Sequence, residues 1–441
     1  MKMERDFTKD LSRFCAELKY SDLSKKTIET IKLFILDYYA AAFAGYRVNK
    51  QFNEACQRLY FEMGGKEESE VLFSDKRLPA ENAAFINAVY AHGADMDDGN
   101  RKAMGHVGAH VMPAVFALCD AIGESRKERI YEAIVVGYEI YCRCAAAVQP
   151  GLVKRGFHST GTAGVLAAAG ASAKLMGLDA EGIYNSIALA TTQGAGLLIV
   201  AESGQECKPI NPARAAQNGI ASAKLVSFGV QSFDRPLDSE KGWFHAMSDV
   251  VDVDMLKLDK TKLAIDECYI KPYPSCRHTH CAIEAARELY EKEGVRAENI
   301  KSARLYIYPN AISIAGQILY PQTDADAKFS IHYCLAKTLE RGNYTLSDLE
   351  VKNIPPKTKS LIEKIELIPD ESMENRSLGI RGAKLELELL DGRVLEKSIT
   401  VPKGDPENPM QLKDVCDKLY SMAEGVWTRE KVSELIEGIV K

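Results

Sequence analysis

The strongest constraint on the fold comes from three segments between residues 162 and 225 that combine helical periodicity with small side chains. These are "TAGVLAAAGASAKLMG", "IYNSIALATTQGAG" and "ARAAQNGIASAKL". Alanine, glycine and serine occupy several faces of each segment, so neighbouring helix axes can approach closely. We therefore expect these segments to form the crowded centre of a multihelical domain.

Other segments of the first part of the chain also have the periodicity of helices. "TIETIKLFILDYYAAAFAGY" carries apolar residues at helical spacing, and Gly45 is placed to end that helix. "PAENAAFINAVYAHG" begins with Pro79, a residue suited to a first turn. Further helices are predicted over residues 110–122, 130–148, 160–176, 180–195 and 212–228.

The pattern changes near residue 268. Residues 302–309, "SARLYIYP", alternate apolar and polar, and "AKLELELLDGRVLEKSITV" is two such strands around Asp391 and Gly392, a hairpin signal. Residues 326–342 and 346–365 between them have helical patterns, and helical patterns return in the tail. The predicted fold class is α+β: a large, discontinuous multihelical domain (residues 1–267 plus 403–441) and a smaller α+β lid (residues 268–402).

Composition excludes several kinds of partner. The net charge of −6 does not favour nucleic acid, and neither a P-loop nor a GxGxxG motif indicates a nucleotide. Eleven cysteines without a CxxC pair indicate reduced thiols. The first residues lack the apolar core of a signal peptide, and no window approaches eighteen consecutive apolar residues. We therefore predict a cytoplasmic protein with no membrane span.

The segment "HGADMDDGNRKAMGHVGAH", residues 92–110, concentrates titratable groups on a glycine-rich backbone. A carboxylate beside an imidazole fixes its tautomer and raises its basicity, which suits Asp95 and His106 to general acid–base chemistry. Glycine permits positive φ and close backbone approach around a ligand. Two alternatives stay open: the aspartates cap a helix or face solvent beside a structural histidine, or His92, Asp95, His106 and His110 bind a metal ion.

Two basic segments each precede a predicted helix. "KRGFHSTGTAG" places His158 at a helix start, where exposed N–H groups and the helix dipole attract anions. "GQECKPINPARAA" places Lys208 before the next one. The alternatives are a basic turn capped by Ser159 or Thr160, and a solvated loop lysine.

The fourth segment, "YIKPYPSCRHTHCAIEAA", lies where the two predicted domains meet, a favoured place for a ligand cleft. It supplies Lys271, Cys276, Arg277 and His278. A nucleophilic Cys276 is disfavoured because the segment offers no orienting Asn or Asp. A positive pocket in an acidic chain predicts a small anion with two or three carboxylates.

These segments, together with "LYPQTDADAKFSIHYCLA" and "GDPENPM", resemble the MmgE/PrpD family in the same order along nearly the whole chain. Known activities in that family are 2-methylcitrate dehydration, cis-aconitate decarboxylation and iminodisuccinate epimerisation. The resemblance implies a homodimer and an active site at the domain interface that needs no metal or cofactor. The family's site residues fall on Asp95, His106, His158, Lys208, Lys271 and Tyr320.

The chain departs from the family pattern at five positions that bear on the substrate. Gly99 stands in place of the usual Thr, and Cys276 stands where the decarboxylase carries a histidine. The other three are Met96 for an aromatic residue, Val107 for Pro and Asn211 for His.

The predicted function is a lyase that dehydrates a small hydroxy di- or tricarboxylate such as citrate or 2-methylcitrate. Lys208, Lys271 and His158 are expected to stabilise developing negative charge as cations. His106, oriented by Asp95, is expected to transfer the proton, and Tyr320 to act on the opposite face. Arg277, His278 and Cys276 are expected to bind substrate. Decarboxylation, epimerisation and an inactive carboxylate-binding scaffold are the alternatives.

Overall fold

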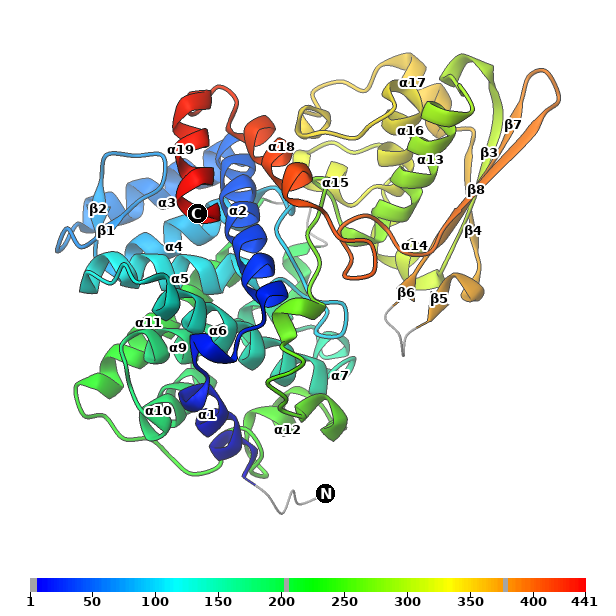
Figure 1. Cartoon of the computed structure of the whole chain (residues 1–441). Helices are drawn as coiled ribbons and strands as arrows, with labels where there is room; N and C mark the ends of the chain where they lie inside the picture. The colour runs from blue at the N-terminus through cyan, green and yellow to red at the C-terminus, as the bar shows by residue number, and fades with distance from the viewer. Residues whose placement is uncertain (1–5, 202–205, 376–379) are drawn as a thin grey trace.

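The computed structural model describes residues 6–201, 206–375 and 380–441, and it has two parts (Figure 1). One part is multihelical, and the smaller part contains a sheet and its covering helices. This confirms the predicted α+β class. None of the described helices combines the length and apolarity that a membrane crossing requires.

The multihelical part contains twelve labelled helices before residue 268 and a short strand pair, β1 (Ser69–Glu70) with β2 (Arg77–Leu78). The helices are α1 (Phe7–Glu17), α2 (Lys25–Arg47), α3 (Lys50–Met63), α4 (Ala80–Gly93), α5 (Gly108–Ile122), α6 (Lys127–Ala147), α7 (Gly151–Lys154), α8 (Ser159–Thr162), α9 (Gly164–Leu175), α10 (Ala180–Thr191), α11 (Ile210–Ser227) and α12 (Trp243–Met247).

Helix α9 occupies the centre of this part and packs against α5, α6, α10 and α11. A Cβ atom at Gly219 on α11 would lie 2.4 Å from the Cβ of Ala168 on α9, and one at Gly170 would lie 2.1 Å from Ile140 Cδ1. Larger side chains would force the helices apart. The small residues therefore allow the close packing that the sequence predicted.

Several predicted helix boundaries in this part were wrong. The helix predicted over residues 180–195 ends at Thr191, and the one predicted from residue 130 begins at Lys127. Gly45 does not end α2, which continues to Arg47. Its missing side chain serves packing instead, because a Cβ there would lie 1.8 Å from the carbonyl oxygen of Tyr90. The predicted helix over 160–176 is divided at Ala163 into α8 and α9.

The smaller part has a four-stranded sheet in the order β4-β3-β7-β8. Strand β3 (Ile300–Ile307) pairs parallel with β4 (Ile365–Pro369) and antiparallel with β7 (Ala383–Leu389), which pairs antiparallel with β8 (Val394–Ile399). In β7 every second residue is buried, as the alternating pattern predicted. Helix α13 (His280–Lys292) packs on β7 and β8 and also contacts α16 (Ile331–Arg341).

The remaining elements of this part are short. They are α14 (Pro309–Ala315), α15 (Asp324–Lys328), α17 (Pro356–Ile362) and the strand pair β5 (Glu374–Asn375) with β6 (Ile380–Arg381). Sequence analysis missed β4 and predicted one helix over 346–365. Pro355 and Pro356 interrupt that segment, so that only α17 is an α-helix there.

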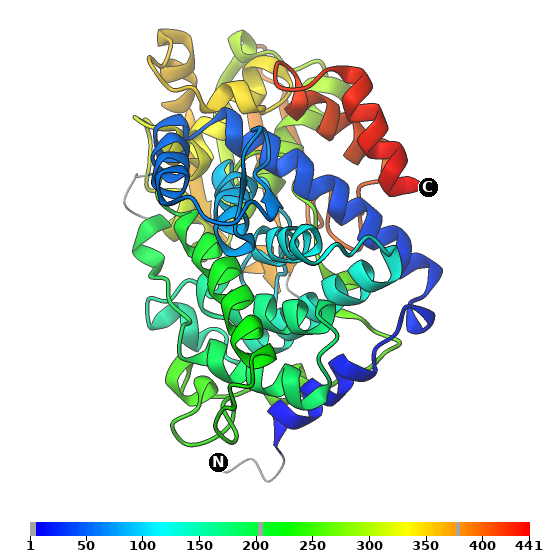
Figure 2. The same ribbon diagram turned by 90° about the vertical axis from the view of Figure 1, so that its left-hand side faces the viewer.

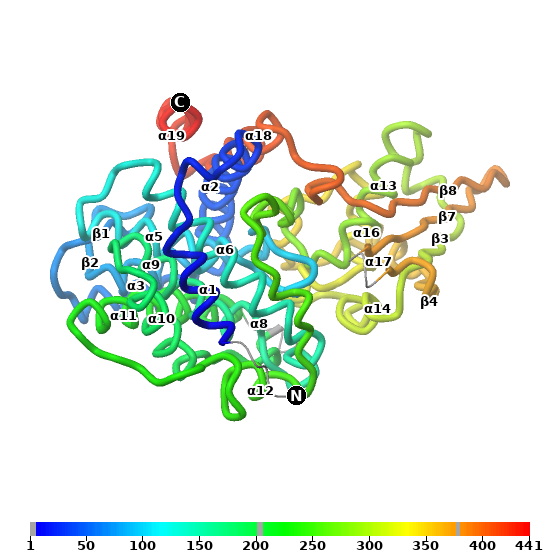
Figure 3. Tube along the Cα trace, turned by 60° about the horizontal axis from the view of Figure 1, so that its bottom comes forward, coloured from blue at the N-terminus to red at the C-terminus, as the bar shows by residue number. Residues whose placement is uncertain are grey.

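The last two helices return to the multihelical part. Helix α18 (Leu412–Ala423) and α19 (Arg429–Val440) both contact α2, and the red and blue ribbons lie side by side (Figures 1, 2 and 3). The boundaries after residues 267 and 402 stay predictions.

Lys418 on α18 binds three buried groups of the multihelical part and its junction with the smaller part. Its ammonium donates to Asp37 Oδ1 at 2.5 Å and to the carbonyl oxygens of Met96 and Lys271, each at 2.8 Å. Burial raises the pKa of Asp37 to about 6, although the Lys418 charge opposes the rise. One side chain thus ties α2 to two chain segments that are distant in sequence.

Replacing Lys418 with Met is expected to reduce the free energy of unfolding by about 3–5 kcal/mol, because Asp37 loses its cation in the interior. Urea denaturation measures the loss. The double variant Asp37→Asn/Lys418→Met should recover part of it. Lys413→Met on the same helix is the control, because Lys413 is exposed and pairs with the exposed Asp417; its cost should stay within about 0.5 kcal/mol. Equal losses in the two single variants would contradict this account.

Candidate active site

A cavity of about 550 Å³ is lined by residues of both parts of the molecule. Eight of the nine predicted site residues line it: Asp95, His106, His158, Lys208, Lys271, Cys276, Arg277 and His278. The structure therefore brings together groups that are up to 183 residues apart in the sequence, the separation of Asp95 and His278.

The ends of helices position the groups from the multihelical part. Asp95 follows α4, and His106 lies two residues before α5. His158 is the residue before α8, and Lys208 lies two residues before α11. These loops leave the side chains outside the tightly packed helix faces, where they can line a cavity.

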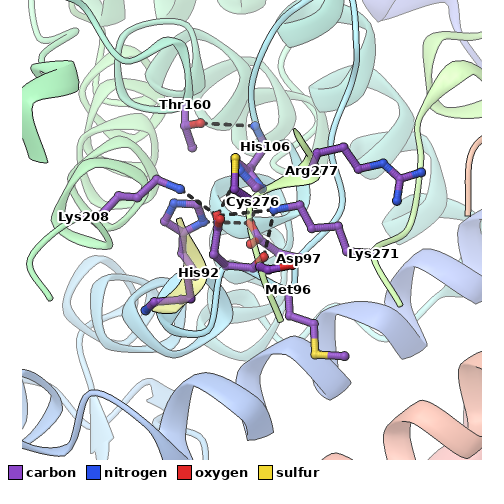
Figure 4. A network of polar contacts seen from close by, with 12 residues as sticks. His92, Met96, Asp97, His106, Thr160, Lys208, Lys271, Cys276 and Arg277 are labelled. Carbon is purple, nitrogen blue, oxygen red and sulfur yellow. Dashed lines mark hydrogen bonds and ion pairs between the residues drawn. The ribbon is translucent and has the colours of Figure 1, made fainter. Parts of the chain in front are cut away.

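Asp95 is the centre of a polar network. Its partners Lys208, His106 and Lys271 are labelled in Figure 4, where their side chains gather at one place. Oδ1 of Asp95 lies 2.7 Å from Lys208 Nζ, 3.3 Å from His106 Nε2 and 3.4 Å from Lys271 Nζ. Lys271 also donates to the Asp95 carbonyl oxygen at 2.8 Å. Burial opposes ionisation, but the nearby ammonium groups hold the pKa of Asp95 well below its usual range.

His106 lies between two carboxylates. Its Nδ1 is 3.1 Å from Asp97 Oδ2, on the side opposite Asp95. The same Asp97 oxygen lies 2.9 Å from His92 Nδ1. Sequence analysis gave the orienting role to Asp95 alone, whereas the structure places Asp97 at the second ring nitrogen. The sequence contained this signal in the close spacing of the two aspartates.

The glycines of this segment allow the backbone to approach other groups closely, and none of them has a positive φ. The positive φ values fall on Asp95 (52°) and Met104 (52°). A Cβ at Gly105 would lie 2.1 Å from the Tyr141 hydroxyl, and one at Gly99 would lie 2.5 Å from the Tyr269 hydroxyl. Aspartate is among the residues that tolerate the left-handed region. The loop therefore lies directly against buried tyrosines, and its carboxylate residue Asp95 has the left-handed backbone conformation.

His158 is held as a neutral hydrogen-bond donor. The amide Nδ2 of Asn211 donates to His158 Nδ1 at 3.0 Å, which leaves the ring proton on Nε2. Burial, reinforced by the nearby Lys208 charge, lowers the pKa of His158 well below its usual range. The expectation that His158 acts as a cation is therefore corrected: its ring is uncharged near neutral pH.

Arg277 lines the cavity but is already paired. Its guanidinium donates to Asp405 Oδ1 at 2.6 Å and to the Lys403 carbonyl oxygen at 3.2 Å, and it stacks on the Tyr269 ring at 4.7 Å. A carboxylate clamp needs unoccupied donors. Arg277, the residue predicted to bind a substrate carboxylate, is therefore already paired with Asp405, and it packs against the Tyr269 ring that lines the cavity.

Two neighbours of Arg277 are buried, and neither is charged near neutral pH. His278 contacts the Tyr308 hydroxyl through Nδ1, and burial lowers its pKa well below the usual range. Burial raises the pKa of the Cys276 thiol, and Asp95 adds to the rise. A thiol held in its protonated form is a poor nucleophile.

Tyr320 is the predicted residue that the structure leaves outside the cavity lining. Its hydroxyl donates to Glu363 Oε1 at 3.0 Å near the surface of the smaller part. A group that acts on substrate must lie within hydrogen-bond reach of it. The role predicted for Tyr320 has no support in this arrangement.

Four side chains could together ligate a metal ion: ligand atoms of His92, Asp95, Asp97 and His106 all lie within 4.8 Å of one another. His110, which the metal alternative included, is not part of this set. Asp95 is already paired with lysine ammonium groups, and Asp97 already contacts the imidazoles of His92 and His106. A metal ion would have to displace them.

Asp98 is buried beside this network. It accepts hydrogen bonds from the Gly108 N–H at 2.7 Å and the Tyr138 hydroxyl at 2.6 Å. Burial raises its pKa to about 8, and the Asp97 charge adds to the rise against these bonds. An unfolded aspartic acid loses its proton near pH 3.9. Between these pH values the folded chain binds the extra proton, so raising the pH removes stability.

Replacing Asp98 with Asn is therefore expected to raise stability relative to the parent chain, increasingly from pH 4 to pH 8. The difference should reach on the order of several kcal/mol and then level off. Chemical denaturation at pH 5, 7 and 8.5 measures it. Asp75→Asn, at an exposed position, is the control and should give a flat difference. A flat difference for Asp98→Asn as well would contradict a raised pKa.

Several lining residues were not predicted from the sequence. They are Asn100, Met104, Gly105, Val153, Leu198, Tyr269, Ser313, Ile314, Gln317, Ile318, Ala325, Asp326, Phe329 and Arg381. Most belong to the smaller part, on the short helices α14 and α15, on β6 and on the loops beside them. For Arg381 the only signal was a charged residue close to a predicted strand.

The fold and cavity define a class: an α+β protein with histidine, lysine and carboxylate groups gathered where its two parts meet. The family models for the MmgE/PrpD N-terminal and C-terminal domains match residues 9–256 and 273–440. The chain belongs to the MmgE/PrpD family.

Curated relatives match over nearly the whole chain. Cis-aconitate decarboxylase of Homo sapiens is 26% identical over 454 residues, covering 100% of this chain and 92% of that protein. Cis-aconitate decarboxylase of Aspergillus terreus is 24% identical, covering 97% of this chain and 91% of that protein. A cis-aconitate decarboxylase-like protein of Aspergillus oryzae is 24% identical, with 99% and 94% covered.

Proposed function

We propose that this protein is a lyase that moves a proton at a carbon next to a carboxylate in a small polycarboxylic acid. The observation that carries the proposal is the convergence of His106, Lys208 and Lys271 on Asp95 in one cavity. A developing carbanion next to a carboxylate spreads charge onto its oxygens, where ammonium groups stabilise it. The family and its decarboxylase relatives support the same area of chemistry.

In the proposed step, His106 exchanges the proton with the substrate carbon. The Asp97 carboxylate lies 3.1 Å from Nδ1 of the His106 ring, and the other ring nitrogen, Nε2, faces Asp95 and the two lysines. Lys208 and Lys271 stabilise the substrate carboxylate that takes up charge. The neutral ring of His158 donates a hydrogen bond from Nε2–H to the substrate.

Dehydration of a hydroxy di- or tricarboxylate, such as citrate or 2-methylcitrate, is the first candidate reaction. The C–H bond breaks with its proton passing to His106, its electron pair forms the C=C bond, and the C–O bond breaks as the hydroxyl leaves as water with a proton from the Lys271 ammonium. Elimination needs both a base and an acid, and the cavity offers the His106 imidazole and the ammonium of Lys271, whose pKa burial lowers.

Decarboxylation is the second candidate, favoured by the curated relatives. There the C–C bond to one carboxylate breaks, CO₂ leaves, and the electron pair takes a proton from His106. Only one proton-transfer group is needed.

A panel of citrate, 2-methylcitrate and cis-aconitate incubated with the protein in D₂O tests the proposal. NMR follows deuterium incorporation, ultraviolet absorbance follows C=C bonds, and a CO₂ assay follows decarboxylation. A gain of C=C bonds without CO₂ supports dehydration, whereas CO₂ release supports the second candidate. Deuterium exchange without net product indicates epimerisation. Binding without exchange would overturn the proposal in favour of a carboxylate-binding scaffold.

The proposal requires no metal ion or other cofactor, because the lining side chains themselves supply proton transfer and charge stabilisation. Dialysis against EDTA is therefore expected to leave kcat unchanged within about twofold. A loss of activity restored by one divalent metal would contradict this and would point to the His92, Asp95, Asp97 and His106 set.

A homodimer in the cytoplasm is proposed with the function. Exposed apolar side chains at and after the end of α11, Leu225, Phe228 and Val230, offer a surface that a second copy would cover. Light scattering after size-exclusion chromatography measures the mass in solution, which should be twice that of the chain.

A further inference from the structure

The cations that line the cavity differ in whether the chain already neutralises them. Lys208 and Lys271 share Asp95, and Arg277 is paired with Asp405. Arg381 is the exception. Within residues 6–201, 206–375 and 380–441, its guanidinium makes one hydrogen bond, a long 3.4 Å contact from Nη2 to the Arg101 carbonyl oxygen, and no ion pair.

The backbone at Arg381 is held in place although the guanidinium is not. Arg381 lies on β6, which pairs with β5 in a short hairpin of the smaller part. Its carbonyl oxygen accepts a hydrogen bond from the buried Cys281 thiol at 3.0 Å. A fixed backbone presents the guanidinium to the cavity at a low cost in conformational entropy.

The carboxylates of the lining do not neutralise Arg381. Asp95 is taken by the lysines, and Asp326 accepts the backbone N–H groups of Gln322 and Thr323 at 2.9 and 3.1 Å. The charge of Arg381 also reaches His278: burial holds the pKa of that imidazole below its usual range, and the Arg381 charge adds to the effect. An unneutralised guanidinium at a cavity attracts a carboxylate, which it can bind through two parallel hydrogen bonds.

We propose that Arg381 binds a carboxylate of the substrate other than the one held by Lys208 and Lys271, and that it thereby selects acids with two or more carboxylates over monocarboxylates. This inference rests on the proposed function. The lysine pair and Arg381 are two anion-binding groups on different segments of the chain, and together they bind an acid with at least two carboxylates. Arg277, the clamp expected from the sequence, supports Tyr269 instead.

Binding of two unreactive acids tests the inference. Propane-1,2,3-tricarboxylate has three carboxylates and no hydroxyl to eliminate, and butyrate has a single carboxylate. Isothermal titration calorimetry gives the ratio of their affinities for the parent chain and for Arg381→Gln. The ratio should fall about 10- to 100-fold in Arg381→Gln, the loss expected for a charge-assisted hydrogen-bond pair. Arg381→Lys should fall between the two, because it keeps the charge without the fork.

Arg393→Gln is the matched control. Arg393 lies in the turn between β7 and β8, where it is exposed and pairs with Asp391, so the ratio should stay unchanged. An unchanged ratio in a folded Arg381→Gln or Arg381→Lys variant, with the parent chain still binding the tricarboxylate, would overturn the inference and leave the proposed function standing. Failure of the parent chain to bind either acid would overturn both.

Discussion

Replacing His106 with Gln is expected to lower kcat about 10²- to 10⁴-fold, the contribution of a positioned general acid–base group. Glutamine keeps a polar group near Asp95 and Asp97 but cannot take or give the proton. Substrate affinity should change little, because the ammonium groups of Lys208 and Lys271 remain. Steady-state kinetics on the acid identified in the panel, together with deuterium exchange by NMR, measures the effect.

His245→Gln is the control for this substitution. His245 lies on α12, away from the cavity lining, and its ring contacts the Ser239 carbonyl oxygen. Its kcat should match that of the parent chain. If His106→Gln retained a kcat within a few fold of the parent, another group would have to transfer the proton, and the assignment of His106 would be wrong.

Replacing Lys208 with Met is expected to lower kcat about 10²- to 10³-fold, because one electrostatic donor at the developing charge is lost. Lys208 contacts Asp95 at 2.7 Å and lies 5.5 Å from the centre of the Phe329 ring. Methionine preserves the apolar stem, so circular dichroism should show the same fold. The effect should fall on kcat more than on KM, since the ammonium is needed most when charge builds up.

The matched control is Lys224→Met on α11, the helix that begins just after Lys208. Lys224 pairs with Glu81 and Glu68 away from the cavity. Its kcat should not change. A rise in KM for Lys208→Met at constant kcat would show that Lys208 contributes only to binding, contrary to the proposed role.

Most helices and the strands β3, β7 and β8 could be predicted because their causes are local. Small residues at helical spacing in α9 and α11 and alternating residues in β7 each report on their own segment. The errors arose where a distant partner decided the outcome. Gly45 looks like a helix end in the sequence, but the backbone of α4 at Tyr90 explains it. Strand β4 needs β3 as its neighbour.

The same difference between local signals and distant partners applies to the candidate site. His106, Lys208 and Lys271 could be chosen because histidine and lysine are conspicuous in motifs that resemble a family. The tautomers and ion pairs of site residues could not be predicted, because partners distant in the sequence decide them. Asn211 sets the tautomer of His158, and Asp405 pairs with Arg277. Arg381 escaped notice because an arginine beside a strand is common, and only the three-dimensional arrangement shows that it lacks a counter-ion within the described residues.

The position of Lys418 also has a consequence for biosynthesis. The ammonium that holds the Met96 and Lys271 carbonyl oxygens belongs to a helix that is translated after both segments. While residue 418 is still inside the ribosomal exit tunnel, the helices that emerged earlier can fold. The loop that carries Asp95 and the segment that carries Lys271 then lack their common anchor, so these two segments are joined only after α18 has been translated.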